Sequence, residues 1–208
     1  MNQQTVIVLD FGGQYNQLIV RRIRDLGVYS ELWPYSTPIE KIKETAPVGI
    51  IFTGGPNSVF EANSLAVSSQ ILELGIPILG ICYGAQLIAH LAGGKVQTAS
   101  AREYGKQSIT YSPSPLFENI PSDNVCWMSH TDYVAEVPAG YKVIASTKTC
   151  PCAAFANADK KIYGVQFHPE VVHTANGLDI LKNFLFNVCE AKGDWTPANF
   201  VNSMVEQI

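Results

Sequence analysis

Apolar residues follow two different patterns along the first 95 positions of the chain. A short continuous apolar run over 5–10 is typical of a strand buried on both faces, and further strands are predicted over 28–32, 48–52 and 77–81. Apolar residues recur at helical spacing over 18–26, 65–74 and 85–91, each closed by a nearby glycine. This strand–helix alternation predicts an α/β fold: a mostly parallel twisted sheet with helices on both faces.

After Lys95 the pattern changes to short β-rich runs that are separated by proline- and serine-rich turns. These runs lie at 107–111, 125–128, 142–146, 153–156 and 162–167. They predict an antiparallel β-rich extension of the sheet. Helical spacing returns over 177–189, and Thr196-Pro197 has the residue types of an N-cap and first turn, which predicts a short helix in the tail.

Composition narrows the class of protein. The chain has 208 residues, of which 47% are hydrophobic and 15% charged, so it is long and apolar enough to form a folded domain. A net charge of −4 argues against general nucleic-acid binding, and no apolar run is long enough for a membrane span. The N-terminus lacks the basic start of a signal peptide. Five cysteines without zinc spacing favour free thiols in a reducing, cytoplasmic compartment and no metal site.

The sequence Gly80-Ile81-Cys82-Tyr83-Gly84 lies between a predicted strand and a predicted helix. It is a G-x-C-x-G form of the nucleophile elbow, in which flanking glycines allow a turn that a Cβ would block. The turn places the sulfur near a helix N-terminus, which favours the nucleophilic thiolate. Cys82 is therefore a candidate nucleophile, although a buried cysteine beside a tight turn is the alternative.

A second candidate motif, Phe167-His168-Pro169-Glu170, ends the last predicted strand. Residues i and i+2 of extended chain point to the same side, so Glu170 can orient the ring of His168. A base oriented by a carboxylate is what a thiol nucleophile requires. A lone histidine is more often structural, but a cysteine elbow in the same sheet favours catalysis.

Two loops are less informative. Gly54-Gly55-Pro56 follows the third strand, where it is either an oxyanion donor, together with the N–H of Tyr83, or a plain turn. The polar run 129–132 follows the predicted strand 125–128, as a substrate wall or a capped turn. Glu103 has no interpretation from its surroundings alone.

Five motifs occur in one order along nearly the whole chain: D-F-G-G-Q-Y at 10–15, T-G-G-P at 53–56, G-I-C-Y-G-A-Q at 80–86, S-H-T-D at 129–132 and G-V-Q-F-H-P-E at 164–170. Together they resemble the triad-type (class I) glutamine amidotransferases, whose domain has a flavodoxin-like fold. Members hydrolyse the side-chain amide of glutamine and pass the ammonia to a synthetase domain. The D-F-G-G-Q-Y opening and the W-T-P-A segment at 195–198 resemble the branch that converts XMP to GMP.

The resemblance implies a role for several residues. Cys82 corresponds to the nucleophile, His168 to the base and Glu170 to its orienting carboxylate. Gly55 and Tyr83 match the oxyanion-hole positions. Three further residues match positions that hold the α-substituents of glutamine: Gln86, Glu103 and, less closely, Asp132. The family more usually has serine at Thr53 and glycine at Thr131, and a β-branched residue at 131 is costly if that backbone needs a positive φ.

The resemblance also implies the domain organisation. Residues 1–193 form the glutaminase domain, and 194–208 form a linker helix toward an ATP-pyrophosphatase (synthetase) domain. This chain lacks the S-G-G-x-D-S phosphate loop of that domain, so we expect no cofactor here, with ATP and Mg²⁺ used only by the synthetase. The full-length enzyme is expected to be a homodimer.

Two alternatives remain from the sequence. One is the glutaminase of another pathway, such as chorismate amination, which the opening motif and the W-T-P-A tail argue against. The other is a non-catalytic binding module on the same fold. The presence of all three triad residues argues against this second alternative.

Overall fold

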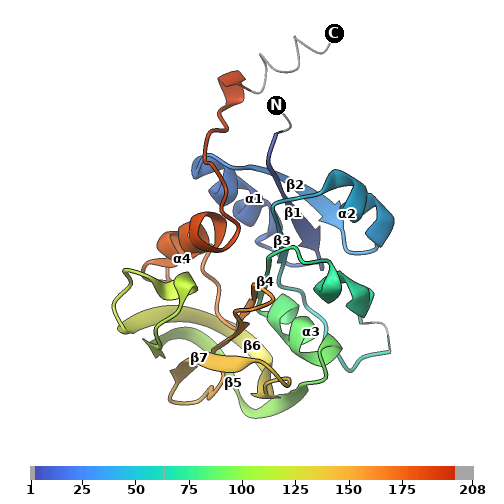
Figure 1. Cartoon of the computed structure of the whole chain (residues 1–208). Coiled ribbons are helices and arrows are strands. Elements are labelled where there is room, and N and C mark those ends of the chain that lie inside the picture. The colour runs from blue at the N-terminus through green and yellow to red at the C-terminus, as the bar shows by residue number, and fades with distance from the viewer. Residues whose placement is uncertain (1–2, 63, 200–208) are drawn as a thin grey trace.

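A nine-stranded sheet runs through the computed structural model, which describes residues 3–62 and 64–199 (Figure 1). The strand order is β2-β1-β3-β4-β9-β8-β7-β5-β6. The first five strands in this order pair in parallel and the other pairs are antiparallel, so the predicted parallel sheet with an antiparallel extension is confirmed. The strands are β1 (Thr5–Asp10), β2 (Tyr29–Pro34), β3 (Gly49–Phe52), β4 (Ile78–Ile81), β5 (Lys95–Tyr111), β6 (Asp123–Glu136), β7 (Lys142–Thr147), β8 (Ala154–Asn157) and β9 (Ile162–Val165).

Helices cover both faces of this sheet, as expected. They are α1 (Asn16–Asp25), α2 (Ile39–Thr45), α3 (Tyr83–Leu91) and α4 (Gly177–Asn183), with short turns η1 (Ser69–Glu73), η2 (Pro115–Phe117) and the π-helical η3 (Phe184–Val188). Side chains of β1 alternate between two cores: Val6 and Val8 pack with α1 and α4, whereas Ile7 and Leu9 pack with α2 and α3. Continuous apolar sequence in β1 is thus explained by burial on both sides.

Two helical segments differ from the prediction. The helix expected over 65–74 is only the short turn η1, because the serine-rich sequence before it supplies a local cap: the N–H of Gln70 donates to Oγ of Ser68 (3.4 Å). The helix α2 was not expected, since only Ile42 of its seven residues is buried and it therefore shows no apolar stripe.

The hairpin β5–β6 is much longer than the two runs that predicted it. Inward positions of β6 alternate strictly, but His130 and Asp132 occupy two of them and so interrupt the apolar pattern. The polar run 129–132 therefore lies within strand β6, not after it. A register shift in the pairing between Thr98 and Glu103 marks an irregularity in β5 at the same level.

The predicted start of the tail helix is confirmed. The N–H of Asn199 donates to Oγ1 of Thr196 (3.1 Å), and residues 197–199 are helical. Just before it, the N–H of Trp195 donates to the carbonyl of Gly27 (2.8 Å), and the Trp195 ring packs beside Tyr29. The tail thus contacts the α1–β2 turn up to Trp195, while 200–208 of the predicted linker helix lie outside the described residues.

Gly84 offers a test of how tightly α3 packs on the sheet. A Cβ at this position would collide with the backbone oxygen of Phe52 in β3, which cannot move without breaking the sheet. We expect Gly84→Ala to lower the free energy of unfolding in urea by about 3 kcal/mol. The control is Gly75→Ala, where φ is +71° but no atom lies within 4 Å of a Cβ, so the cost is about 1 kcal/mol. Equal losses in both variants would contradict this packing argument.

Candidate active site

Cys82 lies on the elbow between β4 and α3, in a backbone conformation that non-glycine residues rarely adopt (φ 53°, ψ −109°). Its N–H donates to the carbonyl of Val165 in β9 (2.8 Å), and the N–H of Gly84 donates to the carbonyl of Thr53 after β3 (3.1 Å). A Cβ on Gly80 would lie 2.6 Å from the backbone of Gly84. The strained turn is therefore held by both neighbouring strands and requires its two glycines.

His168 and Glu170 lie on the loop that follows β9. The Nδ1 atom of His168 is 2.7 Å from Oε1 of Glu170, and both residues are buried. The backbone of His168 is fixed on both sides: its N–H donates to the carbonyl of Trp127 (3.1 Å), and its carbonyl accepts from Oγ1 of Thr174 (2.6 Å). The ring is consequently held in one orientation by the carboxylate and by the strand β6.

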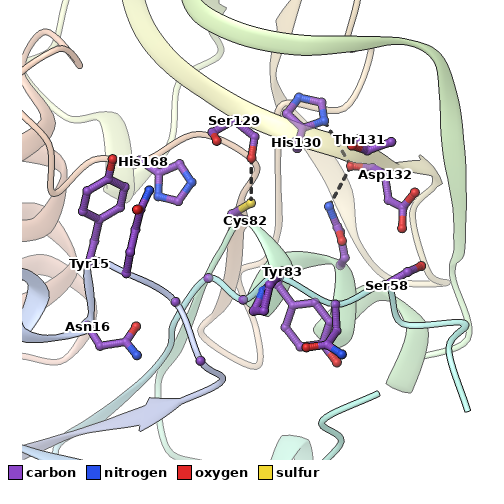
Figure 2. A pocket seen from close by; sticks show the side chains of 18 of the residues that line it. Tyr15, Asn16, Ser58, Cys82, Tyr83, Ser129, His130, Thr131, Asp132 and His168 are labelled. Carbon is purple, nitrogen blue, oxygen red and sulfur yellow. Dashed lines mark hydrogen bonds between the residues drawn. The ribbon is translucent and has the colours of Figure 1, made fainter. Parts of the chain in front are cut away.

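These residues meet at a pocket of about 620 Å³ at the carboxyl ends of the parallel strands (Figure 2). Figure 2 shows Cys82 beside His168 and below the carbonyl of Ser129, which accepts from Sγ at 3.7 Å. Of the residues that the sequence singled out, seven line the pocket: Gly55, Cys82, Tyr83, Gln86, Asp132, His168 and Glu170. Glu103 does not line it.

The surroundings of His168 raise its pKa. Burial by itself lowers the pKa of His168, but hydrogen bonds and charge interactions with Cys82 and Glu170 outweigh it and hold the pKa well above its ordinary value. The second oxygen of Glu170, Oε2, is buried without a partner among the described residues. The contacts with Cys82 and Glu170 therefore favour the imidazolium form of His168.

Two residues that line the pocket beside Cys82, Gly55 and Tyr83, have backbone N–H groups that are unpaired among the described residues. Within the described part of the chain, neither the N–H of Gly55 nor that of Tyr83 has a protein acceptor. A Cβ on Gly55 would collide with the carbonyl of Phe11, and one on Gly54 would lie 3.3 Å from Cε1 of His168. The Gly54-Gly55 loop thus needs glycine because other backbone and the ring of His168 approach it closely.

The loop after β1 forms another wall, which analysis of residue types alone did not assign. Oδ1 of Asp10 accepts from the N–H of Gly12 (2.7 Å) and from Nδ2 of Asn16, which closes the loop. The ring of Tyr15 lies edge-on to that of His168, with centroids 5.5 Å apart. The D-F-G-G-Q-Y motif was the available signal, but its residues have no characteristic spacing for catalysis.

Gln86 and Asp132 lie on the opposite side from this loop. Nε2 of Gln86 donates to the carbonyl of Asp132 (2.7 Å) and to Oε1 of Gln166 (3.2 Å). Oδ1 of Asp132 accepts from Oγ1 of Thr98 (2.8 Å). Both hydrogens of the Gln86 amide are therefore already used by the protein. Gln166, which the sequence analysis did not single out, donates to Sγ of Cys82 (3.6 Å).

The carboxylate of Glu103 is turned away from the pocket and toward His130. Its Oε2 is 2.9 Å from Nε2 of His130, whose Nδ1 is 3.1 Å from the carbonyl of Asp132. Glu103, which the family resemblance places at the ligand, does not line this pocket, and its carboxylate pairs with His130 instead. Burial lowers the pKa of His130 despite this carboxylate.

Glu103, His130 and Cys150 have possible metal-ligand atoms within 4.8 Å of one another. Both ring nitrogens of His130 already face protein acceptors, and the Cys150 thiol donates to the carbonyl of Cys152 (3.4 Å). Glu103, His130 and Cys150 therefore belong to a buried cluster whose polar atoms form hydrogen bonds within the protein.

Thr131 replaces the glycine that is usual in the related motif. It lies within strand β6, and it is not among the residues with positive φ. A β-branched residue is well suited to extended chain, so the cost considered from the sequence does not arise.

The fold and this arrangement of cysteine, histidine and carboxylate define a class of enzyme that activates a thiol to attack a carbonyl carbon. The sequence profile described as "Glutamine amidotransferase class-I" matches residues 7–188, and the chain belongs to this family.

Individual relatives are consistent with this assignment. The chain is 60% identical to a glutamine-hydrolyzing GMP synthase of Caldicellulosiruptor saccharolyticus and 56% identical to that of Clostridium botulinum, with 100% of this chain and 41% of each relative covered. The crystal structure of a Thermoplasma acidophilum protein assigned to GMP synthase has a TM-score of 0.82 at 31% identity, covering 91% of this chain and 96% of that one. A glutamine amidotransferase from Thermotoga maritima (TM-score 0.74, 16% identity, covering 92% and 100%) shares the fold.

The described residues include no helix that is long and apolar enough to cross a membrane.

The protonation of His168 can be measured directly. Because its pKa is raised in the folded chain, protonation stabilises the fold fully below about pH 6.5, and this contribution is lost as the pH rises through the folded-state pKa. We expect the ¹⁵N chemical shifts of the ring to titrate well above pH 6.5. Glu170→Gln should move the midpoint down, because the charge that stabilises the imidazolium is gone. The same midpoint in both proteins would contradict this account.

Proposed function

We propose that this chain hydrolyses the side-chain amide of glutamine through Cys82, His168 and Glu170, and that the ammonia serves a synthetase domain that converts XMP to GMP. The single observation that carries the proposal is the buried His168–Glu170 pair, with a separation of 2.7 Å, beside a cysteine on a strained elbow. Membership of the amidotransferase family supports glutamine as the substrate.

The first half of the reaction forms a thioester. The Cys82 thiolate attacks the amide carbon of glutamine, and the carbonyl oxygen becomes an oxyanion. His168 gives its proton to the amide nitrogen, the carbon–nitrogen bond breaks, and ammonia leaves. Glu170 stabilises the imidazolium and keeps Nδ1–H directed away from the sulfur.

The second half restores the enzyme. A water molecule gives a proton to His168 and attacks the thioester carbon, and the carbon–sulfur bond then breaks. Glutamate leaves and Cys82 regains its starting state, so one water is consumed for each ammonia released. In both halves the free N–H groups of Gly55 and Tyr83 are suited to bind the oxyanion.

Strand β6 forms the wall of the pocket that positions the substrate. Asp132 lines the pocket with a carboxylate suited to the α-ammonium group of glutamine, and Gln86 fixes the backbone of the same residue. Glu103 contributes through His130, which it holds against the Asp132 carbonyl. All three residues singled out by family resemblance thus bear on one segment of the pocket wall.

The partner domain is part of the same proposal. The chain spans 41% of the length of the curated relatives it matches, and those relatives are named for glutamine-hydrolyzing GMP synthesis. Residues 194–208 then form the linker toward an ATP-pyrophosphatase domain, where ATP and Mg²⁺ act, in a homodimeric enzyme. Five free cysteines, one of them catalytic, fit a reducing cytoplasm.

Removing the nucleophile is the primary test. Cys82→Ala should reduce the rate of glutamate release from glutamine by about 10⁴-fold or more, because no other group can form the thioester. In a longer protein with its synthetase domain, GMP formation from free ammonia and XMP should persist. The matched control is Cys189→Ala, a buried cysteine outside the pocket, which should keep its activity. Substantial glutaminase activity in Cys82→Ala would refute the mechanism.

A second test concerns coupling to the partner domain. Hydrolysis without a waiting acceptor wastes glutamine, and the loops that carry Gly55 and His168, together with strand β6 at Asp132, line the pocket where a partner can press on them. Displacing one oxyanion donor costs about 10²–10³-fold in rate. We expect kcat/KM for glutamine to be at least about 10²-fold lower in this chain than in the longer enzyme with ATP and XMP. Equal values would overturn the coupling and leave the glutaminase assignment intact.

A further inference from the structure

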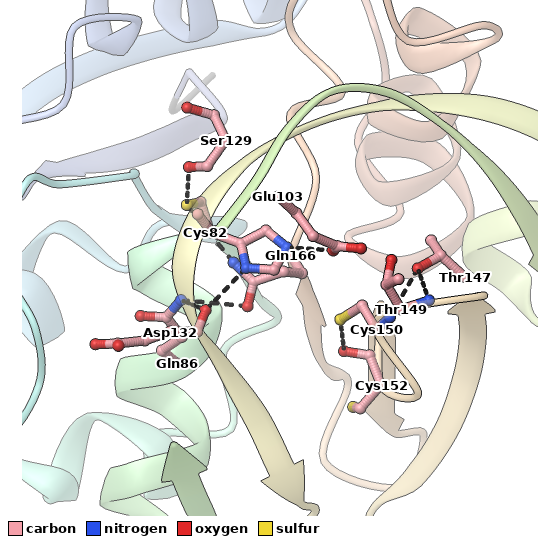
Figure 3. Close-up of polar contacts among 11 residues, drawn as sticks. Cys82, Gln86, Glu103, Ser129, Asp132, Thr147, Thr149, Cys150, Cys152 and Gln166 are labelled. Carbon is pink, nitrogen blue, oxygen red and sulfur yellow. Dashed lines mark hydrogen bonds and ion pairs between the residues drawn. The ribbon is translucent and has the colours of Figure 1, made fainter. Parts of the chain in front are cut away.

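A buried chain of two amides, those of Gln86 and Gln166, reaches the sulfur of Cys82 (Figure 3). Nε2 of Gln166 lies 3.6 Å from Sγ, within hydrogen-bond reach of a sulfur acceptor. Oε1 of Gln166 accepts from Nε2 of Gln86 at 3.2 Å. The side chains of both glutamines are almost fully buried, with 2% and 3% of their surface exposed.

The chain continues to the buried pair of His130 and Glu103 in the interior. Nε2 of Gln86 also donates to the carbonyl of Asp132 (2.7 Å), and Nδ1 of His130 faces that same oxygen at 3.1 Å. Glu103 holds the far nitrogen of His130 at 2.9 Å. Strands β5 and β6 thereby anchor the amide chain at its far end.

The carbonyl of Asp132 fixes the donor and the acceptor in each hydrogen bond of this chain. The carbonyl of Asp132 can only accept, so Gln86 must present its NH₂ group there, and its second hydrogen goes to Gln166. Gln166 must then present its oxygen to Gln86 and its NH₂ to the sulfur. A flip of the Gln166 amide would set two NH₂ groups against each other and its oxygen against Sγ.

A donor at this place favours the charged form of the sulfur. The thiol can donate to the carbonyl of Ser129 (3.7 Å), but a thiolate is repelled by that oxygen and needs donors. His168 supplies one donor through its hydrogen bond with Cys82, and Gln166 supplies a second. An N–H that the fold holds in place stabilises the thiolate without reorganisation during the reaction.

We propose that Gln166 is a positioning residue that stabilises the Cys82 thiolate, and that Gln86 acts through Gln166 by fixing the direction of its amide. The inference rests on the proposed function only in taking Cys82 as the nucleophile. It gives Gln86 a role that does not require contact with glutamine.

Alkylation of Cys82 by iodoacetamide tests this proposal in the absence of glutamine. The rate as a function of pH reports the midpoint at which thiolate forms. Gln166→Met keeps the size of the side chain but has no donor, and we expect the midpoint to rise by about one unit, with about tenfold slower alkylation at pH 7. Gln166→Glu should raise the midpoint further, because a carboxylate faces the thiolate. Gln86→Met should shift it in the same direction by less.

Other groups around the pocket must stay constant in this experiment. The titratable residues that line it are Tyr15, Glu61, Tyr83, Tyr104, His130, Asp132, His168 and Glu170, and Glu103 lies behind His130. None of them is altered in these variants. Gln70→Glu makes the same charge change at an exposed position and should leave the midpoint at its wild-type value.

Mass spectrometry of the peptide that contains Cys82 separates its signal from the other thiols. Burial raises the pKa of Cys126, Cys150 and Cys152 to about 12, and it also raises that of Cys189, so these four react slowly. A cooperative thermal transition shows whether each variant is folded. If Gln166→Met does not fold, Gln86→Met decides the question, since it breaks the same chain one link earlier.

An unchanged midpoint in folded Gln166→Met would overturn the role of Gln166. A higher KM for glutamine in Gln86→Met, with alkylation like that of the wild type, would overturn the role of Gln86 and favour direct substrate binding. Failure of the proposed function looks different: the wild-type chain would be alkylated normally at Cys82 but would release no glutamate from glutamine.

Discussion

The site depends on one backbone constraint, the left-handed conformation of Cys82. An L-residue at φ 53° and ψ −109° is held there only because surrounding structure leaves no alternative. Hydrogen bonds from the elbow reach β9 on one side and the end of β3 on the other, and Gly80 and Gly84 remove the atoms that would block the turn. The parallel sheet therefore forces the sulfur into the pocket at its carboxyl edge.

Most of the fold can be predicted from the local pattern of apolar residues. The strands β1, β3 and β4 are continuous apolar runs because helices cover both of their faces, and short runs without a polar position are typical of such burial. The length of the hairpin β5–β6 was underestimated because its inward positions do not form a continuous apolar pattern. Inward positions in β6 carry His130 and Asp132, whose burial depends on partners far away in the sequence, so a local pattern cannot reveal them.

Residues of the site likewise divide into those that the local sequence marks and those whose partners lie far away in the sequence. That Cys82, His168 and Glu170 lie in one pocket could be predicted, because short-range geometry, an elbow and an i, i+2 pair, fixes where each side chain lies. Gln166 is only four residues beyond Ile162 at the start of β9, yet nothing local marks it, since its contacts come from β4–α3. Glu103 was assigned to the ligand by family resemblance, whereas in the structure its carboxylate pairs with His130 across the β5–β6 pairing. The two residues are 27 positions apart in the sequence, so the local sequence does not reveal the pair.

The buried polar residues around the pocket are costly for folding unless each is paired, which explains why they form continuous chains. Carbonyl groups of β6 at Trp127, Ser129 and Asp132 face the backbone of His168, the sulfur of Cys82 and the amide of Gln86 in turn. One strand of the antiparallel extension thus aligns residues from three different segments of the parallel half. A displacement of β6 along its axis would alter all three contacts together, so the position of the hairpin couples the placement of His168, Cys82 and Gln86.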